Sequence, residues 1–531
     1  MRVLIRCDAS LAIGSGHVMR CRNLARALQK RGAEVLFVCR QQPGDLIALL
    51  AEEFSVMRLL SLADPESSLD GLKGRDLYTA WLGCSQLQDA NDCLKIISSA
   101  EMGSIQWLVV DHYGLDQTWE HLISEGLCRS NHGKPKFLVF DDLADRYHQA
   151  DVLVDSNRLD STASDTYGMY VDTGCRLLLG PAYAPLDPLY AQLQHLAPQR
   201  RSLQRVLVFF GGVDQANYTA VAVEALCHPD LAHLAVDVVL GAAAPHHDSV
   251  LKLVQSRPHT QLYAGLSSLA GLILRADLAI GAAGTVSWER AALALPTLVT
   301  PVADNQRQGA QALVDAGSAL LIDLKQSDHP SALLIKVVKD LLAESDRLKK
   351  LSDAARVLGD GRGLGRLAAI MLGPEDGRRL RPATLFDETM YHAWVNDSEV
   401  RRQSFNTDPI SLEQHQRWFR NRLKSADALL RVLVDSQGLP LGQIRLERSA
   451  TKPSLAVVGF SLDPIARGHG LASELLQLGV AELVRAWGGG VKAYGEVRVT
   501  NPASTRAFLR AGFKEGFPPR SGVRCFSWPA A

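Results

Sequence analysis

Short apolar runs alternate with amphipathic stretches up to about residue 350 of the chain. The first run covers residues 2–6, and apolar residues then recur at helical spacing from 18 to 30. Short runs that are apolar throughout are typical of buried parallel strands, and a 3.6-residue period predicts a helix packed on them. The alternation predicts an α/β fold with doubly wound parallel sheets, whose ligands gather at the carboxyl ends of the strands. Further runs of this kind lie at 34–39, 107–110, 136–140, 151–154, 206–210, 236–240, 261–263 and 277–280.

The pattern changes twice along the chain. Residues 193–203 are polar and basic and include a proline, so they predict a hinge between two α/β halves. Glycines and charged residues at 356–379 predict a linker to a third domain. In that domain, helices are expected at 387–395 and 411–423, and strands at 431–435, 441–447 and 455–462. The predicted domains are therefore 1–195, 196–355 and 380–531, with 356–379 as the linker.

Composition narrows the functional classes. The 531 residues carry a formal net charge of zero, so neither nucleic acid nor an anionic membrane is expected as a partner. No apolar run reaches the roughly 20 residues that a membrane helix needs, and the chain begins with a strand rather than a secretory leader. The nine cysteines are scattered without a Cys-x-x-Cys pair, so no metal site is expected and a cytoplasmic location is predicted. The sequence leaves the oligomeric state open.

A glycine-rich turn follows the first predicted strand. It contains Gly14 and Gly16, and His17 stands at the start of the next helix. Glycines let a ligand approach the backbone closely, and the positive end of a helix favours anions and disfavours a protonated imidazole. His17 is therefore a candidate general base, although a histidine here can also be a cap or a solvated side chain. Met19 replaces the third glycine of a dinucleotide fingerprint, so a nicotinamide or flavin site is not indicated.

Two later strand ends carry acidic residues. Asp111 is followed by a histidine, a tyrosine and a glycine, and Asp141 is followed directly by Asp142. Paired carboxylates can bind a metal or share a proton, but adjacent aspartates at a strand end also serve as caps for the next helix. The sequence does not decide whether Asp8 or Asp141 assists His17.

A second glycine-rich turn follows the predicted strand at 277–280. Its Gly284, Thr285 and Ser287 offer backbone amides and hydroxyls at a helix start, which is an arrangement that binds a diphosphate. Glu289, one turn into the helix, is placed to accept hydrogen bonds from a ribose. An ordinary capped helix with small packing residues gives a similar pattern, but the glycines, the buried strand and Glu289 together favour nucleotide binding.

Eight motifs occur in order through the first two predicted domains. They are Arg6-x-Asp8, Ile13-Gly14-x-Gly16-His17-x-x-Arg20, Asp111-His112-Tyr113-Gly114, Phe140-Asp141-Asp142, Gly180-Pro181-x-Tyr183-Ala184, Gly211-Gly212-x-Asp214, Gly284-Thr285-x-Ser287-x-Glu289 and Asn305-Gln306. In this order they resemble the UDP-2,4-diacetamido-2,4,6-trideoxy-β-L-altropyranose hydrolases of pseudaminic acid biosynthesis. That family is similar to GT-B glycosyltransferases, which pair two Rossmann-like halves. The resemblance implies metal-independent hydrolysis of a UDP-sugar, with water in place of a sugar acceptor.

The resemblance also implies roles for individual residues. His17 would take the proton of a water molecule that attacks the anomeric carbon, and UDP would leave with inversion. Because UDP is a good leaving group, a second carboxylate is less needed as an acid, and Asp141 and Asp142 are expected to position or cap. Tyr113 and Asn305 are expected to face the sugar or the water. The expected substrate and UDP site comprises Gly14, Gly16, Tyr113, Tyr183, Gly212, Gly284, Thr285, Ser287, Glu289 and Asn305.

The third predicted domain has a glycine-containing loop between the strand at 455–462 and the next helix. Backbone amides at the start of a helix can cradle a diphosphate. The loop residues Arg467, Gly468, Gly470 and Ala472 are followed at the matching distance by Asn501, Ser504, Phe508, Gly512 and Phe513. Together these residues resemble the GNAT N-acetyltransferases, which implies acetyl-CoA as a cosubstrate bound by Arg467, Gly468, Gly470, Ala472, Asn501 and Ser504.

Two positions bear on acetyl transfer. Glu496 resembles the base of sugar-amine acetyltransferases and would deprotonate the attacking amine, although it can also be a solvated strand residue. Phe508 stands where this family commonly has a tyrosine, whose hydroxyl protonates the departing thiolate. A phenylalanine cannot donate a proton, so another donor serves or this activity is slow.

The sequence favours a bifunctional enzyme acting on UDP-aminosugars. The patterns Trp394-x-Asn396 and Ser411-x-x-x-His415-x-x-Trp418-Phe419 resemble sugar-amine acetyltransferases. The resemblance implies acetylation of the 4-amino group of a UDP-aminosugar, followed by hydrolysis of the product. One alternative is a GT-B glycosyltransferase fused to an unrelated amine or protein acetyltransferase. Another is a nucleotide-sugar-binding scaffold whose acetyltransferase site is weak or silent.

Overall fold

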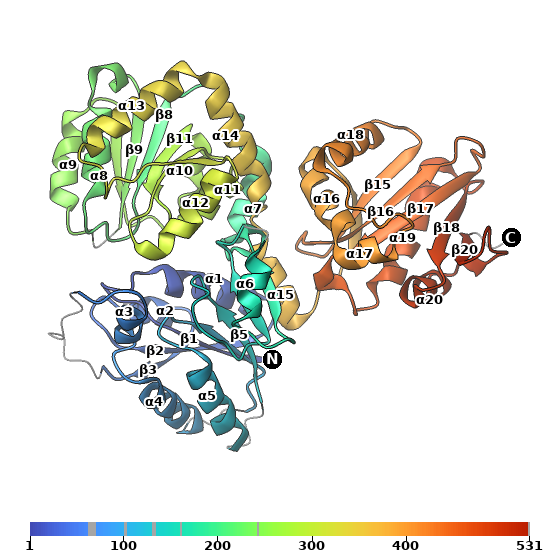
Figure 1. The fold of residues 1–531 in the computed structure, drawn as a ribbon, viewed down its shortest axis with the longest axis horizontal. Coiled ribbons are helices and arrows are strands. Elements are labelled where there is room, and N and C mark those ends of the chain that lie inside the picture. Colours follow the sequence, from blue (N-terminus) through green and yellow to red (C-terminus); the bar gives the residue numbers. More distant parts are fainter. Residues whose placement is uncertain (62–70, 100–102, 130–133, 160–161, 242–243, 529–531) are drawn as a thin grey trace. The chain divides into compact units, whose positions relative to one another are not determined.

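The computed structural model describes residues 1–61, 71–99, 103–129, 134–159, 162–241 and 244–528. The chain divides into two compact units, Met1–Leu367 (unit 1) and Ala368–Ala531 (unit 2). Unit 1 contains two parallel sheets and unit 2 contains one mixed sheet (Figure 1). The predicted α/β architecture, a pair of Rossmann-like halves followed by a third α/β domain, is confirmed.

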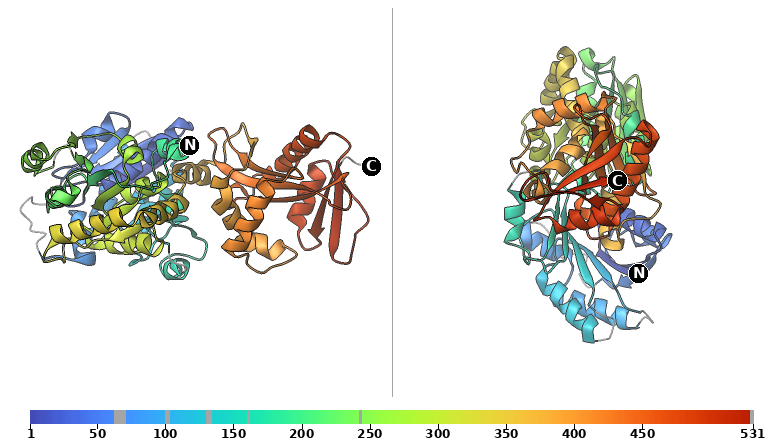
Figure 2. Two further views of the ribbon diagram at one scale, coloured as in Figure 1. Left: turned by 90° about the horizontal axis from the view of Figure 1, so that it is seen from above. Right: turned by 90° about the vertical axis from the view of Figure 1, so that its right-hand side faces the viewer.

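The first half of unit 1 is built on a seven-stranded sheet in the order β3-β2-β1-β4-β5-β6-β7. Every neighbouring pair in it is parallel, and helices cover both of its faces (Figures 1 and 2). The strands are β1 (Arg2–Cys7), β2 (Glu34–Arg40), β3 (Ser55–Leu59), β4 (Trp107–Asp111), β5 (Lys136–Phe140), β6 (Val152–Asp155) and β7 (Arg176–Leu179). The helices are α1 (Gly16–Lys30), α2 (Ile47–Ala51), α3 (Gly74–Trp81), α4 (Gln86–Ser99), α5 (Gln117–Arg129), α6 (Ala163–Gly168) and α7 (Pro188–Leu193), with the short helices η1 (Pro181–Tyr183) and η2 (Gln194–Leu196).

The second half of unit 1 has a six-stranded parallel sheet in the order β10-β9-β8-β11-β12-β13. Its strands are β8 (Arg205–Phe209), β9 (Ala235–Leu240), β10 (Thr260–Ala264), β11 (Leu278–Ala282), β12 (Thr297–Thr300) and β13 (Ala319–Leu321). Its helices are α8 (Tyr218–Leu226), α9 (His247–Ser256), α10 (Ala270–Arg275), α11 (Val286–Ala292), α12 (Arg307–Asp315), α13 (Pro330–Ala343) and α14 (Ser345–Leu358), with η3 (Pro229–Leu231) and η4 (Asp304–Gln306).

The strand order reverses direction at one point in each sheet, between β1 and β4 in the first half and between β8 and β11 in the second. Open α/β sheets bind ligands outside the carboxyl ends of the strands at such a point. Both glycine-rich turns of the sequence analysis lie there, because one follows β1 and the other follows β11. The topology therefore brings the predicted site residues to two defined edges.

Most predicted elements are present, with ends that shift by up to three residues. The predicted strands at 136–140 and 455–462 match β5 and β17 end to end, whereas several strands, β3, β7 and β13 among them, were not predicted. Of the segment 356–379, predicted as a linker, residues Gly363–Leu372 form helix α15. Gly363 at its start packs against η1 so closely that a Cβ would lie 2.1 Å from the carbonyl oxygen of Ala184. The last segment of unit 1 therefore returns to the first half.

Unit 2 is built on a sheet in the order β14-β15-β16-β17-β18-β20-β19. Its neighbours are antiparallel except β17 and β18, which run parallel. The strands are β14 (Arg379–Pro382), β15 (Ala428–Val434), β16 (Pro440–Arg448), β17 (Leu455–Leu462), β18 (Lys492–Arg498), β19 (Lys514–Glu515) and β20 (Val523–Trp528). The helices are α16 (Glu388–Asn396), α17 (Ser398–Gln403), α18 (Leu412–Leu423), α19 (Leu471–Trp487) and α20 (Pro502–Arg510), with η5 (Leu385–Asp387) and η6 (Pro464–Ala466).

The parallel pair at the centre of unit 2 is joined over only part of its length. Residues Leu455–Val457 of β17 pair with Lys492–Tyr494 of β18, and the two strands separate beyond this point. The second parts of β17 and β18 therefore lack each other as hydrogen-bonding partners, and a ligand can reach their backbone there.

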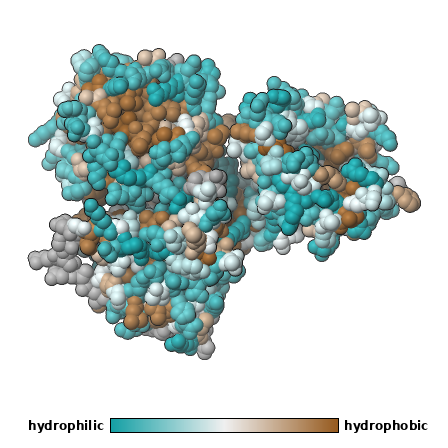
Figure 3. Space-filling model, viewed as in Figure 1, coloured by the Kyte–Doolittle hydropathy of each residue, from teal (hydrophilic) through white to brown (hydrophobic). Residues whose placement is uncertain are grey.

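The surface seen in Figure 3 is mostly hydrophilic, with apolar patches in both units. Among the described residues, none of the helices is both long enough and apolar enough to cross a membrane.

Candidate functional site

His17 is held by a carboxylate at the first switch point, the place between β1 and β4 where the strand order of the first sheet reverses. It lies at the start of α1 and is 8% exposed, and its Nδ1 lies 2.5 Å from Oδ1 of Asp111 at the end of β4. Burial alone would raise the pKa of Asp111, but Arg20 and His17 hold this pKa below its ordinary value. When Nδ1 donates its proton to this carboxylate, Nε2 is the ring nitrogen that can accept a proton. This arrangement suits a general base.

Arg20 fixes the carboxylate that holds His17. Its Nε and Nη2 donate to the two oxygens of Asp111 at 2.6 and 2.7 Å, and its Nη1 donates to Asp142 at 2.8 Å. A two-pronged arginine–carboxylate pair is a strong and geometrically specific contact. Since Arg20 and His17 lie one turn apart on α1, the helix places both side chains on the same strand end.

Asp142 extends this network to the second half of unit 1. Its Oδ1 accepts a hydrogen bond of 2.8 Å from Nδ2 of Asn157. The side-chain oxygen of Asn157 in turn accepts one of 3.0 Å from Nε1 of Trp288 on α11. A continuous chain of hydrogen bonds thus joins the His17–Asp111 pair to the helix that follows the second glycine-rich turn.

The aspartate that is hydrogen-bonded to His17 is Asp111 rather than Asp8 or Asp141. Asp8 instead accepts from the Arg6 guanidinium at 2.6 Å and from the backbone of Arg40 at 2.7 Å. Asp141 pairs with Arg146 at 2.7 Å and caps the turn that follows β5. Although burial opposes it, the charge of Arg146 lowers the pKa of Asp141 to about 2.

Tyr113 is more enclosed than the sequence suggested. It is 4% exposed, its ring meets the His17 ring edge-on at 4.5 Å, and its hydroxyl donates to Asp142 at 2.6 Å. Tyr113 therefore lies beside the predicted base, but its hydroxyl proton is already donated to Asp142. Gly14 and Gly16 have open space where a Cβ would lie, and Gly14 has a φ of +82°. These two glycines leave room for a ligand beside His17.

The second switch point is lined by glycines. A Cβ on Gly281 would lie 2.0 Å from the carbonyl oxygen of Phe209, and one on Gly241 would lie 1.8 Å from that of Gly212. The ends of β8, β9 and β11 can therefore approach only because these residues have no side chain. A Cβ on Gly212 would lie 3.6 Å from Oγ of Ser15, so the two glycine-rich regions adjoin each other.

The residues predicted to hold UDP differ in how open they are. Thr285 is exposed, whereas Ser287 is 5% exposed and its hydroxyl accepts a hydrogen bond from Arg290 at 2.9 Å. Glu289 accepts a hydrogen bond from the hydroxyl of Tyr190, and burial raises the pKa of Glu289 to about 7. A carboxyl group with this pKa can donate a hydrogen bond as well as accept one near neutral pH.

Three other predicted residues are partly exposed. Gly284 lies at the start of the turn before α11, and a Cβ there would meet only Nε2 of Gln306, at 3.8 Å. Asn305 lies in η4, and Tyr183 lies in η1 of the first half.

The predicted acetyl-CoA loop of unit 2 has the backbone shape that binds phosphate. Gly468 and Gly470 have φ values of +81° and +75°, with open space where a Cβ would lie. Gly470 directly precedes α19, whose 17 residues begin at Leu471, so the free amides of a long helix face this loop. These residues fit the diphosphate of acetyl-CoA. Ala472 lies in the first turn of the same helix.

Other predicted acetyl-CoA residues are engaged within the protein. The Arg467 guanidinium donates to Asp397 at 2.8 Å and to the carbonyl oxygen of Leu462 at 3.1 Å. It therefore fastens the loop to the end of β17. Asn501 accepts from the backbone amide of Ser504 at 3.0 Å and caps α20.

Glu496 lies on β18 beyond the point where this strand leaves β17. Tyr494 donates a hydrogen bond of 3.1 Å to it, and Arg520 contacts it at 3.2 Å. Phe508 is 1% exposed and stacks on Phe526 with 5.1 Å between ring centroids. Phe508 therefore belongs to the core and offers no acidic proton.

Several residues of the site had no assigned role in the sequence analysis. Arg20 and Asp111 occurred in quoted motifs, and their positions at a helix start and a strand end were the available signal. No sequence signal could have found Asn157, Trp288 or Tyr190. Asn157 and Trp288 are 131 residues apart in the chain, and Tyr190 is 99 residues from its partner Glu289. Among the described residues, no group of three or more His, Cys, Asp or Glu side chains is arranged to hold a metal ion.

Two family models match parts of the chain. The glycosyltransferase family 28 C-terminal domain matches residues 206–362, and the acetyltransferase (GNAT) domain matches residues 378–514. Unit 1 therefore carries a glycosyltransferase-28-like domain, and unit 2 carries a GNAT domain.

Individual proteins are similar over different shares of the chain. The spore coat polysaccharide biosynthesis protein SpsG of Bacillus subtilis (strain 168) is 27% identical over 218 residues, which is 40% of this chain and 64% of SpsG. The match thus spans less than two thirds of that relative. An uncharacterized protein of Methanocaldococcus jannaschii, MJ1062, is 20% identical over 537 residues and 97% of both chains. The crystal structure of Acinetobacter baumannii MurG aligns with 70% of this chain and 99% of its own, at 13% identity and a TM-score of 0.45.

Proposed function

We propose that the protein is a bifunctional enzyme that acts on UDP-aminosugars. Unit 2 transfers an acetyl group from acetyl-CoA to the 4-amino group of a UDP-aminosugar. Unit 1 then hydrolyses the product, UDP-2,4-diacetamido-2,4,6-trideoxy-β-L-altropyranose, to the free sugar and UDP. The observation that carries the hydrolytic part is the hydrogen bond between His17 and the buried, ionised Asp111.

The arrangement around His17 supports water as the nucleophile. As the water oxygen bonds to the anomeric carbon, one water proton passes to Nε2 of His17. The bond between that carbon and the β-phosphate oxygen breaks, and UDP leaves with the electron pair. Asp111 stabilises the imidazolium that forms, and Arg20 keeps Asp111 ionised. An attack opposite to the leaving group inverts the anomeric centre.

The second half of unit 1 supports the binding of the leaving group. Gly212, in the turn that follows β8, lies beside Ser15, which is two residues before His17 in sequence. Backbone amides stabilise the charge that develops on a departing diphosphate. The similarity to SpsG, a spore coat polysaccharide biosynthesis protein, and to a glycosyltransferase family agrees with a sugar substrate.

The GNAT domain supports acetyl transfer. The amine nitrogen attacks the thioester carbonyl of acetyl-CoA, the carbon–sulfur bond breaks, and CoA leaves as the thiolate. Glu496 accepts the proton of the amine. Because Phe508 cannot donate a proton, the thiolate takes its proton from water.

The decisive experiment for unit 1 uses the UDP-diacetamido sugar alone in ¹⁸O-labelled water. We expect UDP release, followed by ³¹P NMR, and one labelled oxygen on the anomeric carbon of the sugar rather than on UDP. The first-formed anomer should be inverted. Release of UDP only after a sugar acceptor is added would assign unit 1 to glycosyl transfer instead.

The experiment for unit 2 uses acetyl-CoA and the UDP-4-amino sugar, with free CoA measured by a thiol reagent. We expect acetylation that falls at least tenfold in Glu496→Gln, while the KM for acetyl-CoA stays unchanged. An exposed glutamate on α18, Glu413, provides the matched control Glu413→Gln. Equal turnover in Glu496→Gln and the control would refute the assigned base.

A further inference from the structure

Unit 2 contains a pocket of about 300 Å³ between α16, α18 and β16. Tyr391 and Trp418 supply aromatic walls, and Gln443 and Arg445 reach it from β16. None of the described residues that line it is an aspartate or a glutamate. Concave sites with aromatic walls and a few polar groups are the usual form of small-molecule sites.

The two residues from β16 lie on a defined face of the sheet. Between them in sequence, Ile444 packs on α19, where a Cβ on Gly479 would lie 2.3 Å from its Cδ1. Successive side chains of a strand point to opposite faces. Gln443 and Arg445 therefore point away from α19.

Glu496 points to this same face. Its neighbour Gly495 packs against Phe508 of α20, whose Cζ lies 2.4 Å from the position of a Cβ. Phe508 shares one hydrophobic core with the buried residues of α19, so Glu496 points away from both helices. The pocket and the proposed base of acetyl transfer therefore face the same side of one sheet.

The pocket contains polar atoms that a ligand can satisfy. Nε2 of Gln443 donates to Oγ of Ser461 at 3.1 Å, but its Oε1 is buried and has no hydrogen-bond partner among the described residues. A buried unsatisfied carbonyl is costly, and a ligand N–H or O–H group would remove that cost. Nε2 of His415 donates to the backbone oxygen of Glu388 at 3.0 Å, which leaves Nδ1 to accept. Burial lowers the pKa of His415, so the ring stays neutral at neutral pH.

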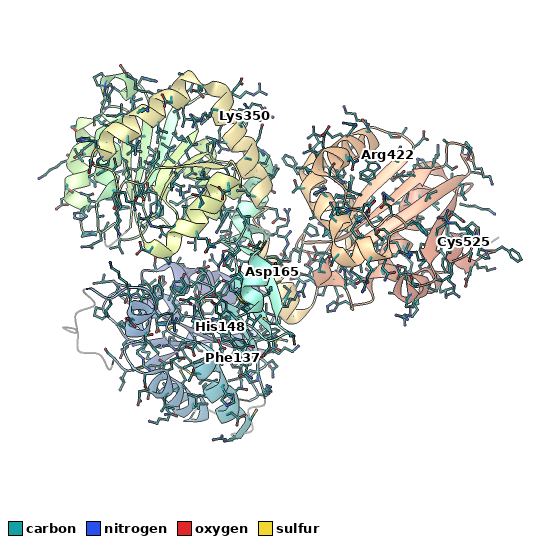
Figure 4. The ribbon with its side chains drawn as sticks, in the orientation of Figure 1. Phe137, His148, Asp165, Lys350, Arg422 and Cys525 are labelled. Atoms are coloured by element: carbon teal, nitrogen blue, oxygen red, sulfur yellow. The ribbon has the colours of Figure 1, made fainter. Side chains whose placement is uncertain are left out.

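The charges around the pocket are predominantly positive. The guanidinium of Arg445 lies 5.5 Å from the centre of the Trp418 ring. Glu447 is shared between Arg445, at 3.9 Å, and Arg422, at 3.5 Å, the latter labelled on α18 in Figure 4. Arg401 also lies near Arg445, and burial together with the positive charge of Arg445 lowers the pKa of Arg401. Three arginines and one carboxylate leave a net positive field.

We propose that this pocket is the acceptor subsite of unit 2 and that it selects an anionic sugar nucleotide over polyamines and other polycations. This inference rests on the acetyl-transfer part of the proposed function and names the features that choose its acceptor. Gln443 and His415 accept hydrogen bonds from the hydroxyl and amide groups of the sugar nucleotide. Arg445 attracts its phosphates, and the amine reaches toward Glu496 on the same face.

The test uses the full chain labelled with 5-fluorotryptophan and followed by ¹⁹F NMR. The Trp418 signal is assigned by its loss in Trp418→Phe, and the Trp288 signal of unit 1 by its loss in Trp288→Phe. The probes are UDP-N-acetylglucosamine and spermidine. We expect UDP-N-acetylglucosamine to shift the Trp418 signal in a saturable way and spermidine to leave it in place. Arg445→Ala should weaken the response of Trp418 at least tenfold.

The control is Arg417→Ala, because Arg417 is an exposed arginine of α18 that pairs with Glu413 outside the pocket. It should leave the titration unchanged. A Trp418 signal that is silent to UDP-N-acetylglucosamine, or that responds equally in Arg445→Ala, overturns the proposal. So does a stronger response to spermidine. The Trp288 signal reports nucleotide binding in unit 1 separately, so failure there with a normal Trp418 response counts against the proposed role of unit 1 alone.

Discussion

The two halves of unit 1 share one strand order around their switch points but equip those points in opposite ways. In the first half, the last registered pair of β1 and β4 is Cys7 with Asp111, and the site is packed with charged side chains. In the second half, the paired position at the end of β8 and β11 is Phe209 with Gly281, and the site is lined by bare backbone. In the function we propose, one topology supports a fixed side-chain base on one sheet and an anion site on the other.

The ionisable groups follow the same division. Arg20 and His17 lower the pKa of Asp111 against the effect of burial, so that this buried carboxyl group stays charged. Glu289 has a weaker counter-charge, and burial raises its pKa to about 7. The first half therefore uses the hydrogen bonds of Arg20 and His17 to keep Asp111 ionised. In the second half, Glu289 is partly protonated near pH 7.

The largest effect is expected at the base itself. We predict that His17→Ala lowers the rate of UDP release by about 10³-fold, because general-base catalysis contributes roughly 10²–10⁴-fold. The measurement is UDP release from the UDP-diacetamido sugar at pH 7.5. His121, an exposed histidine of α5, gives the matched control His121→Ala, which should release UDP at the normal rate. A loss below tenfold in His17→Ala would remove His17 from this role.

The glycine lining of the second half can be tested through stability. We predict that Gly281→Ala destabilises unit 1 by about 2–4 kcal/mol or prevents folding, because the new Cβ would lie 2.0 Å from the Phe209 carbonyl oxygen. Gly271 of α10 has nothing within 4 Å of a Cβ position, so Gly271→Ala should leave stability equal or slightly higher. Urea unfolding of both variants gives the comparison. Equal midpoints would show that the strand ends have more room than their spacing indicates.

The raised pKa of Glu289 predicts a pH dependence of stability. An ordinary glutamate loses its proton near pH 4.5, whereas folded Glu289 keeps it up to about pH 7. Stability should therefore fall as pH rises through this window and level off above it. Glu289→Gln should abolish that part of the slope in urea midpoints measured between pH 5 and 8. The exposed Glu224 of α8 gives the control Glu224→Gln, which should keep the wild-type slope.

Local features of both halves could be predicted from the sequence. The turns at Gly14 and Gly284, the helix α1 that begins at Gly16 and most strands of the two sheets are encoded by neighbouring residues. Partnerships across the sheets could not, because they depend on which strands become adjacent. His17 meets a carboxylate 94 positions away, and Arg467, predicted to hold acetyl-CoA, meets Asp397 at 70 positions. Composition and periodicity do not predict these contacts, because the contacts depend on the order of the strands in the sheets.

The smallest expected effect concerns the hydrogen bond that joins the two halves. Trp288→Phe keeps an aromatic ring in a site that is 2% exposed but removes the N–H that orients Asn157. Asn157 would then hold Asp142 less firmly, and through Arg20 the Asp111 carboxylate would be less well placed. One lost hydrogen bond is worth about 0.5–1.5 kcal/mol, which corresponds to roughly a 2- to 12-fold lower kcat.

A double-mutant cycle isolates this contact. Asn157→Ala should also lower kcat, and the double variant should lose less than the product of the two single losses, because both changes break the same chain of hydrogen bonds. The pH at which the rate is half-maximal should be unchanged in Trp288→Phe, because Trp288 contacts Asn157 and not His17. If the two losses simply multiplied, Asn157 and Trp288 would act separately. The charged site of the first half would then keep its geometry without help from the second.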